Sequence, residues 1–574
     1  MNTKDDSATW KKIITSSLGA LFVLGVIGVV FFNFYRENFK NREPIGYDGD
    51  SLAVLASIKA AGEGGIKAFQ PIRISRLNAP TEAWWSDVPI SEFCFLPAGI
   101  LLKFTDLFTA SSIFVGSSFC LAGLAFYISC IWLGFGILPS VAMSILYGLA
   151  PYAFARNLEH MILTLYFVVP LFLLCAFRLW GEEVAERSFK EVLALAVITF
   201  FCSLFNPYYL VMFLVLLGFV FVGHVWNRVW MGMLFCGIVG LAAVFGFIAQ
   251  NIDTFYFRLI EGANPAAVSR DLWWMVKFGL YLPDLFLPPY HDWRFFEVLA
   301  GKNYQWKIPV ELQGESQTAY IGLVAGCFLI VLISIGFMQA SSVRGREQSA
   351  WFWFALIAFL FAVTGGLNYL LGAFGFQMLR ASNRYSIFLS AIALFYGCSI
   401  ISRFSNRIIL CFILSLFLLV FGIVDQTPAY PDWLKSKHQS AMEDFRLDAE
   451  FFPNLEKKFP AGTQIFQFPV HPFPESGPVH KMGDYEHFRP YLHTNTLKFS
   501  YGTVKCRKHS DWQRELNVAS PEKIYNELAT RNFSAVLINR RAYQDEGENL
   551  MNKLKNNGFS EINRNKNFII LKIL

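Results

Sequence analysis

Two carboxylates that flank a glycine, Asp48 and Asp50, follow a long apolar stretch near the N-terminus. At a membrane surface, such a pair can act as a general base or share a hard divalent cation, Mg²⁺ or Mn²⁺. The same residues also suit an Asp-Gly turn in which Asp50 or Ser51 caps the following helix. Taken alone, the short motif favours the turn, so a catalytic role depends on other residues nearby.

Ionisable residues also lie between two apolar stretches, at Arg156, Glu159 and His160. Ionisable side chains are costly next to lipid and usually face a polar cavity, which makes these three candidates for substrate binding. Arg156 and Glu159 could instead pair with each other at the membrane interface. The sequence leaves both interpretations open.

Two arginines four positions apart, Arg380 and Arg384, form a third group. Arginines in this arrangement can hold a phosphate group through paired hydrogen bonds. Positive residues also commonly end spanning helices at the interface, so this pattern too has a simpler interpretation. Three weaker substrate-binding candidates lie in long polar loops: Asp87, His291 and Glu315.

The composition indicates a membrane protein. The 574 residues are 54% hydrophobic and only 16% charged, whereas soluble domains average about 25% charged. The net charge of +6 is modest and forms no basic stripe, so we expect no nucleic-acid partner. The ten cysteines include no CxxC motif and no Cys/His cluster with metal-binding spacing, which argues against a disulfide framework.

A spanning helix needs roughly 20 mainly apolar residues, and this criterion predicts about eleven crossings. The predicted crossings are residues 13–35, 110–131, 139–155, 161–177, 192–205, 208–222, 231–248, 319–337, 350–363, 385–401 and 408–424. A further apolar stretch at 93–104 is placed along the membrane surface, because counting it as a crossing would spoil the charge pattern of the later loops.

Positive charges fix the predicted orientation. With a cytoplasmic N-terminus, every short inner loop except the connection at 133–138 carries arginine or lysine, as the positive-inside rule requires. Residues 36–109, 251–318 and 425–574 then lie outside. The last of these segments is charged and has short strand-like stretches at 463–468, 535–539 and 568–571, so we predict an extracytoplasmic α/β domain over 425–574 beside a membrane domain over 1–424.

Several well-known motifs are missing. The chain has no GxxxxGK[ST], GxGxxG, GxSxG or HExxH pattern, so nucleotide-driven transport and zinc hydrolysis have no support.

One crossing followed by an acidic outer loop resembles the GT-C superfamily of membrane glycosyltransferases. In that superfamily, the first loop begins with an acidic pair and continues with a surface helix, a glycine and a proline-containing turn. The matching residues here are Asp48, Asp50, Ala53, Ala56, Gly64, Gly65, Asp87, Val88 and Pro89. Two positions depart from the pattern: Gly49 stands where the partner glutamate is usual, and His160 stands near the usual aspartate.

A second resemblance covers nearly the whole chain. Short motifs at residues 47–52, 76–80, 154–156 and 501–505 are similar to a group of bacterial polytopic proteins known mainly as candidate sugar transferases. This resemblance implies the architecture more than the reaction, and it implies a bacterial inner (plasma) membrane with the outer segments in the periplasm.

Together the resemblances imply transfer of a hexose or pentose from a polyprenyl-phosphate donor to a glycan or lipid acceptor, such as lipopolysaccharide or a surface glycan. Asp48 would be the general base, and Asp50 would orient the acceptor or share a divalent cation. Arg380 and Arg384, or Arg156, would hold the leaving phosphate, and His160 would protonate or orient one of its oxygens.

Two other functions are compatible with the pattern, a transporter or flippase for lipid-linked sugars and a non-catalytic assembly factor. Transporters need ionisable residues within their spans, yet the predicted spans between Met161 and Phe247 are nearly free of charge. The polar segments gather on one side instead, which favours chemistry at the outer surface.

Overall fold

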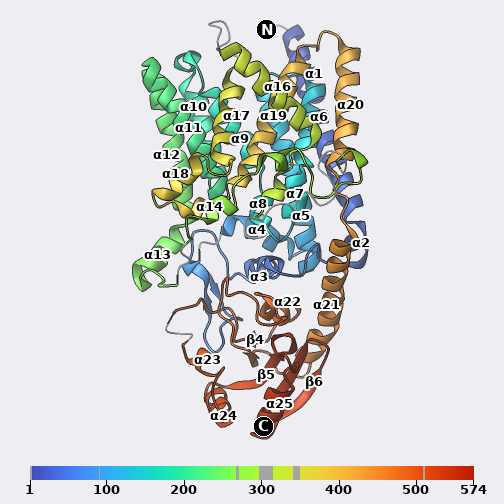
Figure 1. Ribbon diagram of the computed structural model, residues 1–574, viewed down its shortest axis with the longest axis vertical. Coiled ribbons are helices and arrows are strands. Elements are labelled where there is room, and N and C mark those ends of the chain that lie inside the picture. Colours follow the sequence, from blue (N-terminus) through green and yellow to red (C-terminus); the bar gives the residue numbers. More distant parts are fainter. Residues whose placement is uncertain (1–2, 89–90, 267–269, 297–313, 341–348, 508–510) are drawn as a thin grey trace.

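The computed structural model describes residues 3–88, 91–266, 270–296, 314–340, 349–507 and 511–574. A bundle of helices occupies one end of the molecule, and a domain that contains a β-sheet occupies the other (Figure 1). The N-terminus lies at the far end of the bundle, whereas the C-terminus lies at the far end of the sheet domain.

Seven segments of the described chain are helical, long and apolar enough to cross a bilayer. They are Ile14–Phe34 within α1 (Thr3–Phe34), Leu107–Trp132 (α5), Ile137–Arg156 (α6, Ile137–Gly148, and α7, Pro151–Arg156), Pro207–Asn227 (α11), Trp230–Gln250 (α12), Ser382–Ser402 (η8, Ser382–Tyr385, and α19, Ser386–Ser402) and Ile408–Gln426 (α20).

Four shorter apolar helices occupy the remaining predicted crossings. They are α9 (Val168–Arg178), preceded by the single turn α8 (Met161–Thr164), α10 (Phe189–Cys202), α16 (Leu323–Ala340) and α17 (Ser349–Ala362). The prediction of a polytopic helical membrane protein is therefore confirmed, and each predicted crossing contains a helix. Helix length alone supports seven of the predicted crossings, so the total of about eleven stays a prediction.

Small residues let three membrane helices approach closely. A Cβ atom on Gly123 of α5 would lie 2.3 Å from Ile27 Cδ1 of α1 and 3.0 Å from the backbone oxygen of Ser144 in α6. Gly148, at the end of α6, packs against the same Ile27 side chain and against the Cα of Gly123. Such contacts drive helix association where water is absent, and they fix the end of α6, from which the chain continues to Arg156.

The loop after α1 folds into short elements rather than a further span. They are α2 (Arg36–Asn41), α3 (Asp50–Gly62), β1 (Arg73–Ile74), β2 (Ala83–Trp84), η1 (Trp85–Asp87) and α4 (Glu92–Leu101). The predicted surface stretch 93–104 corresponds to α4, which at 10 residues is too short to span a bilayer. It packs against α3, because a Cβ on Gly99 would lie 2.7 Å from Ala61 Cβ.

The second long outer segment also consists of short elements. The described ones are α13 (Ile252–Glu261), α14 (Trp274–Lys277), η3 (Leu282–Leu285) and η6 (Ser316–Ala319). Later short elements are α18 (Leu367–Ala373) and η7 (Gln377–Leu379), and η2 (Glu182–Glu186) lies between α9 and α10.

The C-terminal part begins with the long helix α21 (Asp432–Glu456) and contains a five-stranded mixed sheet in the order β4-β3-β5-β7-β6. Strand β3 (Gln464–Phe468) pairs in parallel with β4 (Lys498–Phe499) and with β5 (Phe533–Asn539), whereas β7 (Phe568–Ile573) is antiparallel to β5 and to β6 (Phe559–Arg564). The helical elements are η9 (Glu486–Phe488), α22 (Arg489–His493), α23 (Asp511–Glu515), α24 (Pro521–Thr530), η11 (Arg540–Ala542) and α25 (Glu548–Lys555). The predicted α/β character and the strands predicted at 463–468, 535–539 and 568–571 are confirmed.

The first outer loop is joined directly to the sheet domain. The backbone N–H of Asn78 donates to the Tyr501 carbonyl at 2.9 Å, and the indole N–H of Trp85 donates to the Gly502 carbonyl at 3.0 Å. The Trp85 ring also stacks on Phe473, with ring centroids 4.9 Å apart. The acidic motif of this loop therefore lies at the junction between the helical bundle and the sheet domain.

Candidate active site

The acidic motif forms a tight turn at the start of α3. Gly49 has a positive φ of 49°, which glycine adopts at little cost. A Cβ atom at Gly49 would lie 3.3 Å from Glu159 Oε1, so the Glu159 carboxylate lies against this turn. The helix begins at Asp50 with no side-chain cap, so the alternative in which Asp50 or Ser51 caps α3 is not what the structure shows.

The backbone explains why Glu159 reaches this turn instead of pairing with Arg156. Helix α7 ends at Arg156, and the next residue, Asn157, has φ 43° and ψ −147°. The chain therefore leaves the helix before a side-chain pair three positions apart can form. Glu159 supplies a carboxylate beside Gly49, the position at which the GT-C pattern has a glutamate.

The carboxylates of this group disfavour each other's charge. Burial raises the pKa of Asp50 to about 6, and the carboxylates of Glu475 and Asp484 add to the increase. Burial also raises the pKa of Glu159, together with the charges of Asp48 and Asp50. Asp50 and Glu159 are nevertheless exposed to solvent.

A lysine from the C-terminal domain contacts Asp48, the expected general base. Lys437 of α21 places its Nζ atom 2.9 Å from Asp48 Oδ2. The Lys437 side chain is 61% exposed, so this ion pair contributes little to stability. It does place a positive charge next to the Asp48 carboxylate.

The residue before Asp48 is held by a buried network. The Tyr47 hydroxyl donates to Asp448 Oδ2 at 2.7 Å and lies 2.8 Å from His493 Nε2. Arg489 binds the same Asp448 oxygen through its Nε atom. All four side chains are buried or nearly so, and Asp448 comes from α21. The outer domain therefore fixes the backbone next to Asp48.

Two arginines converge on one glutamate beside the acidic turn. Arg156 Nη1 lies 2.5 Å from Glu315 Oε2, and Arg384 Nη2 lies 3.2 Å from the same oxygen. Arg156 also donates to Asn383 Oδ1 at 3.3 Å. Arg156 is only 1% exposed, and the Nε atoms of both arginines have no hydrogen-bond partner among the described residues. The cluster has one more positive than negative charge and donors to spare.

The electrostatics of this cluster favour a bound anion. Although burial opposes ionisation of Glu315, the charges of Arg156 and Arg384 lower its pKa to about 2. Burial and the charge of Arg156 lower the pKa of His160 to about 4. His160 is therefore neutral near neutral pH, so it can orient an oxygen but is a poor proton donor. Two arginines around one carboxylate form an arrangement that also suits phosphate.

The acidic turn and the arginine cluster are close enough to influence each other. The charge of Arg156 partly offsets the increase in the pKa of Glu159, and the charge of Glu315 adds to the increase in the pKa of Asp50. A carboxylate group and an anion site therefore lie side by side, at the end of the bundle that faces the sheet domain (Figure 1).

Arg380 lies next to this cluster without joining it. Its guanidinium packs over the rings of Trp274 and Phe278, at 5.1 and 5.0 Å from their centroids. Arg384 instead packs over Tyr208, 4.4 Å from its ring centroid, and binds Glu315. The pairing of Arg384 with Arg156 replaces the expected pairing of Arg384 with Arg380.

Two of the predicted substrate-binding residues have structural partners. Asp87 accepts two hydrogen bonds from Arg507, at 2.8 and 2.7 Å, and one from Asn264 at 2.6 Å. His291 Nε2 lies 3.1 Å from the backbone oxygen of Asp425, at the end of α20. These contacts join segments of the chain, and among the described residues neither side chain has a partner in the acidic turn.

Asp48 and Asp50 are the candidates for a divalent cation, but their surroundings do not complete a ligand set. In the part of the chain that the structure describes, no three His, Cys, Asp or Glu side chains are grouped to hold one metal ion. The Lys437 ammonium already contacts Asp48. The described residues at this turn therefore do not fit a divalent cation.

Sequence reasoning missed Tyr47, Lys437, Asp448 and Arg489. Tyr47 directly precedes Asp48, so its position was a usable signal. Its partner Asp448 is 401 residues away, and no local pattern links the two.

Comparisons with known proteins give structural likeness only. No protein-family model matches the chain, and neither does any curated protein. ArnT from Cupriavidus metallidurans bound to undecaprenyl phosphate is similar over 96% of this chain and 97% of its own, with 10% identity and a TM-score of 0.45. The arabinofuranosyltransferase AftD from Mycobacteria is similar over 96% of this chain but 41% of its own, with 12% identity and a TM-score of 0.45.

A third similar structure is the Archaeoglobus fulgidus oligosaccharyltransferase in complex with Zn and sulfate. It is similar over 95% of this chain and 72% of its own, with 11% identity and a TM-score of 0.39. Glycosyl-transferring enzymes are named among these structures. All three TM-scores are below 0.5.

Proposed function

We propose that this protein is an integral membrane glycosyltransferase that moves a sugar from a polyprenyl-phosphate donor to a glycan or lipid acceptor at the outer face of the membrane. The observation that carries the proposal is the pairing of two sites. A carboxylate group around Asp48 lies beside an anion site formed by Arg156 and Arg384.

The arginine pair suits the phosphate of the donor. Glu315 shows that Arg156 and Arg384 can bind one anionic oxygen together. A phosphate offers more acceptor oxygens than a carboxylate and can also use the two Nε atoms. Arg156 and Arg384 both lie at ends of apolar helices, so the lipid tail of a donor held there could extend along the bundle.

The proposed reaction is a displacement at the anomeric carbon. The acceptor hydroxyl oxygen forms a bond to this carbon, and the bond between the carbon and the phosphate oxygen breaks, with its electron pair going to the phosphate. Asp48 takes the hydroxyl proton, and Arg156 and Arg384 stabilise the charge that develops on the phosphate. Atoms and charge balance without a further reactant.

The neighbouring groups have supporting roles in this proposal. Asp50 and Glu159 accept hydrogen bonds from acceptor hydroxyls. His160, as a neutral imidazole, orients a phosphate oxygen. Arg380 remains within electrostatic range of Arg384 and adds positive potential near the phosphate.

The cellular setting is proposed from the topology. The N-terminus lies in the cytoplasm, and the domain over residues 425–574 lies in the periplasm of a bacterial inner (plasma) membrane. The membrane domain covers residues 1–424. The acceptor then belongs to an envelope glycan or lipid, such as lipopolysaccharide or a surface glycan.

The proposal is tested by transfer of radiolabelled sugar from a panel of polyprenyl-phosphate hexoses and pentoses by the purified protein. Asp48→Asn should lower the rate by at least about a hundredfold, since a general base contributes roughly that much. Asp432→Asn is the matched control, because Asp432 is a fully exposed aspartate on α21 that contacts only Lys435 in a surface pair. It should transfer at the normal rate.

Label moving to an acceptor or to water with the unchanged protein, and not with Asp48→Asn, supports the enzyme. Binding of every donor without turnover would overturn it in favour of a flippase or a non-catalytic assembly factor. Equal turnover by the Asp48→Asn variant would remove Asp48 as the base.

A further inference from the structure

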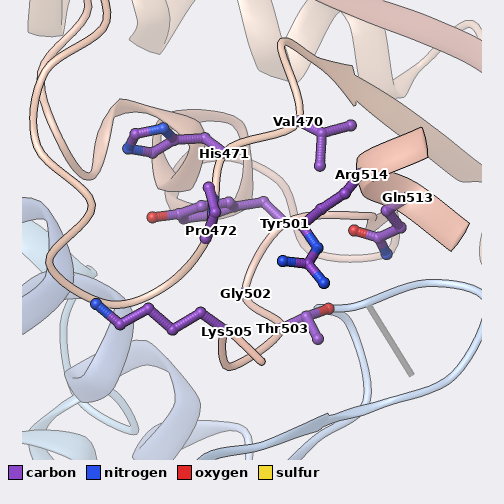
Figure 2. Close-up of a pocket in the computed structure, with 9 residues that line it drawn as sticks. All are labelled: Val470, His471, Pro472, Tyr501, Gly502, Thr503, Lys505, Gln513 and Arg514. Atoms are coloured by element: carbon purple, nitrogen blue, oxygen red, sulfur yellow. The ribbon is translucent and has the colours of Figure 1, made fainter. Parts of the chain in front are cut away.

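A small, open pocket lies in the domain that contains the β-sheet (Figure 2). Its walls come from three segments that are far apart in sequence. The lining residues are Val470, His471, Pro472, Tyr501, Gly502, Thr503, Lys505, Gln513 and Arg514. The proposed glycosyl transfer assigns no role to these residues.

The pocket lies where α/β sheets commonly bind ligands. One wall follows directly after β3, and another follows directly after β4. These two strands are parallel neighbours, so their carboxyl ends lie at the same edge of the sheet. Ligands of open α/β sheets bind in the crevice outside the carboxyl ends of the strands. The position in the fold therefore points to a binding site.

Positive charge dominates the lining. Lys505 extends along one wall, and the guanidinium of Arg514 points toward the middle of the pocket, between Tyr501 and Thr503 (Figure 2). Lys505 donates to the backbone oxygen of Glu475 at 3.1 Å, and Arg514 pairs with the exposed Asp511 on its own helix. No carboxylate is among the lining residues that the structure describes. An anionic group is favoured in such a pocket.

The other lining groups suit a sugar. The buried Tyr501 offers a ring, Thr503 a hydroxyl and Gln513 an amide. An aromatic face with a few placed hydrogen-bonding groups is the usual composition of a small-molecule site. Gln513 is held by hydrogen bonds to Asn78 and to the Ser500 carbonyl, each at 3.3 Å, so its position is set before a ligand binds.

The pocket is connected to the acidic turn. His471 Nε2 lies 3.1 Å from Asp484 Oδ1, and the Tyr501 hydroxyl donates to the Asp484 carbonyl at 3.2 Å. The Asp484 charge in turn contributes to the raised pKa of Asp50. One residue therefore contacts the pocket wall and influences the carboxylates of the proposed catalytic site.

We propose that this pocket binds a negatively charged sugar residue of the acceptor, one that carries a carboxylate or a phosphate group. Lys505 and Arg514 bind the anionic group, and Tyr501, Thr503 and Gln513 contact the sugar ring and its hydroxyls. The neighbouring sugar of the acceptor then presents its hydroxyl toward Asp48. The assignment as an acceptor site rests on the proposed function, whereas the binding of an anionic sugar does not.

The experiment measures binding of glucuronic acid, glucose 6-phosphate and glucose to the full-length protein in detergent by saturation-transfer NMR and calorimetry. The two acids should bind at least about tenfold more tightly than glucose, because the cations recognise the charge. Comparison of the two acids shows whether the natural group is a carboxylate or a phosphate. Equal binding of glucose would overturn the proposal.

The variants Lys505→Gln and Arg514→Gln should each weaken binding of the acids by about tenfold. Arg514 is half-exposed, and Lys505 reaches solvent, so neither change should disturb folding, which is checked by gel filtration. Lys523→Gln is the matched control, since Lys523 is an exposed cation of α24 outside the pocket that pairs with Glu515 at 3.2 Å. Unchanged binding in the two pocket variants would overturn the proposal.

Failure of this proposal and failure of the proposed function give different results. Asp48→Asn should bind the acids normally while losing transfer. If the unchanged protein binds the acids but transfers no sugar, the pocket proposal stands and the proposed enzyme function is rejected. If Lys505→Gln and Arg514→Gln transfer sugar with a normal acceptor KM, the enzyme function stands and the pocket proposal is rejected.

Discussion

The hydroxyl of Tyr47 donates a 2.7 Å hydrogen bond to Asp448, and the two buried residues are 401 positions apart in the sequence. Tyr47 precedes the proposed base, and Asp448 belongs to α21 of the outer domain. The position of Asp48 therefore depends on a helix that follows the last membrane helix. In the proposed mechanism, the C-terminal domain is therefore part of the catalytic framework and not only a cover.

Tyr47→Phe tests this dependence. The change removes the hydroxyl but keeps the ring, so Asp448 retains Arg489 as its partner. We expect kcat to fall by about tenfold because Asp48 is less well placed, and KM to change little because Tyr47 does not touch substrate. The free energy of unfolding should fall by about 1 kcal/mol, as for one lost buried hydrogen bond.

Tyr525→Phe is the control for Tyr47→Phe. It removes one hydroxyl that donates to the Leu574 carbonyl at 2.9 Å in the same domain, far from the acidic turn. Its kcat should be normal. A fall in thermal stability of Tyr47→Phe with no change in kcat would show a purely structural role for Tyr47.

The raised pKa of Asp50 predicts the pH dependence of the reaction. If Asp50 acts as a carboxylate, kcat/KM should fall as the pH drops below about 6, rather than below the ordinary value of 3.8. The contribution of Asp50 to the free energy of unfolding should change with pH in the opposite direction. The folded state favours protonated Asp50, so its contribution is complete below pH 3.8 and is lost as the pH rises through about 6.

The pH dependence is measured as initial transfer rates from pH 4.5 to 8 for the unchanged protein and for Asp50→Asn. The variant should be slower and should lack the limb near pH 6. A limb that persists unchanged in Asp50→Asn would assign it to another group, with Glu159 as the next candidate, since its pKa is also raised.

Local patterns predicted much of the fold. Apolar stretches of sufficient length became helices, because a backbone in lipid must satisfy its own hydrogen bonds. Short apolar stretches with β-branched residues, such as 535–539, became strands of the sheet. The acidic turn was recognisable because a turn at Gly49, between two aspartates, needs no distant partner to form.

The partners within the site could not be predicted in the same way. The sequence spacing allowed Arg156 to pair with Glu159, but the positive φ of Asn157 ends the helix and separates them. Arg156 instead meets Glu315, 159 residues later, and Glu159 meets Gly49. Tertiary packing decides which loop segments come together, and hydrophobic periodicity gives no information about tertiary packing.

Glu315 predicts a competition with the donor phosphate. It occupies the oxygen site between Arg156 and Arg384, so a phosphate must displace it. Removing its charge in Glu315→Gln should tighten binding of undecaprenyl phosphate by about tenfold, because the arginines then lack an internal anion. Binding is measured with the purified protein by fluorescence titration or calorimetry.

Glu315→Asp is the matched variant because it keeps the charge and shortens the side chain. It should bind undecaprenyl phosphate much less tightly than Glu315→Gln does. Weaker binding by Glu315→Gln than by the unchanged protein would mean that Glu315 holds the two arginines in place and does not compete with phosphate.

Variants of the ion pair between Asp87 and Arg507 test whether Asp87 has a structural or a substrate-binding role. The Asp87 side chain is 1% exposed and accepts two hydrogen bonds from Arg507, so it joins the first outer loop to the segment after β4. Asp87→Asn and Arg507→Gln should each lower the free energy of unfolding by about 1–3 kcal/mol, and the double variant should cost less than their sum. Thermal unfolding of the four proteins gives this coupling, and acceptor KM should stay unchanged in all of them. A large increase in KM without loss of stability would return Asp87 to the substrate-binding residues.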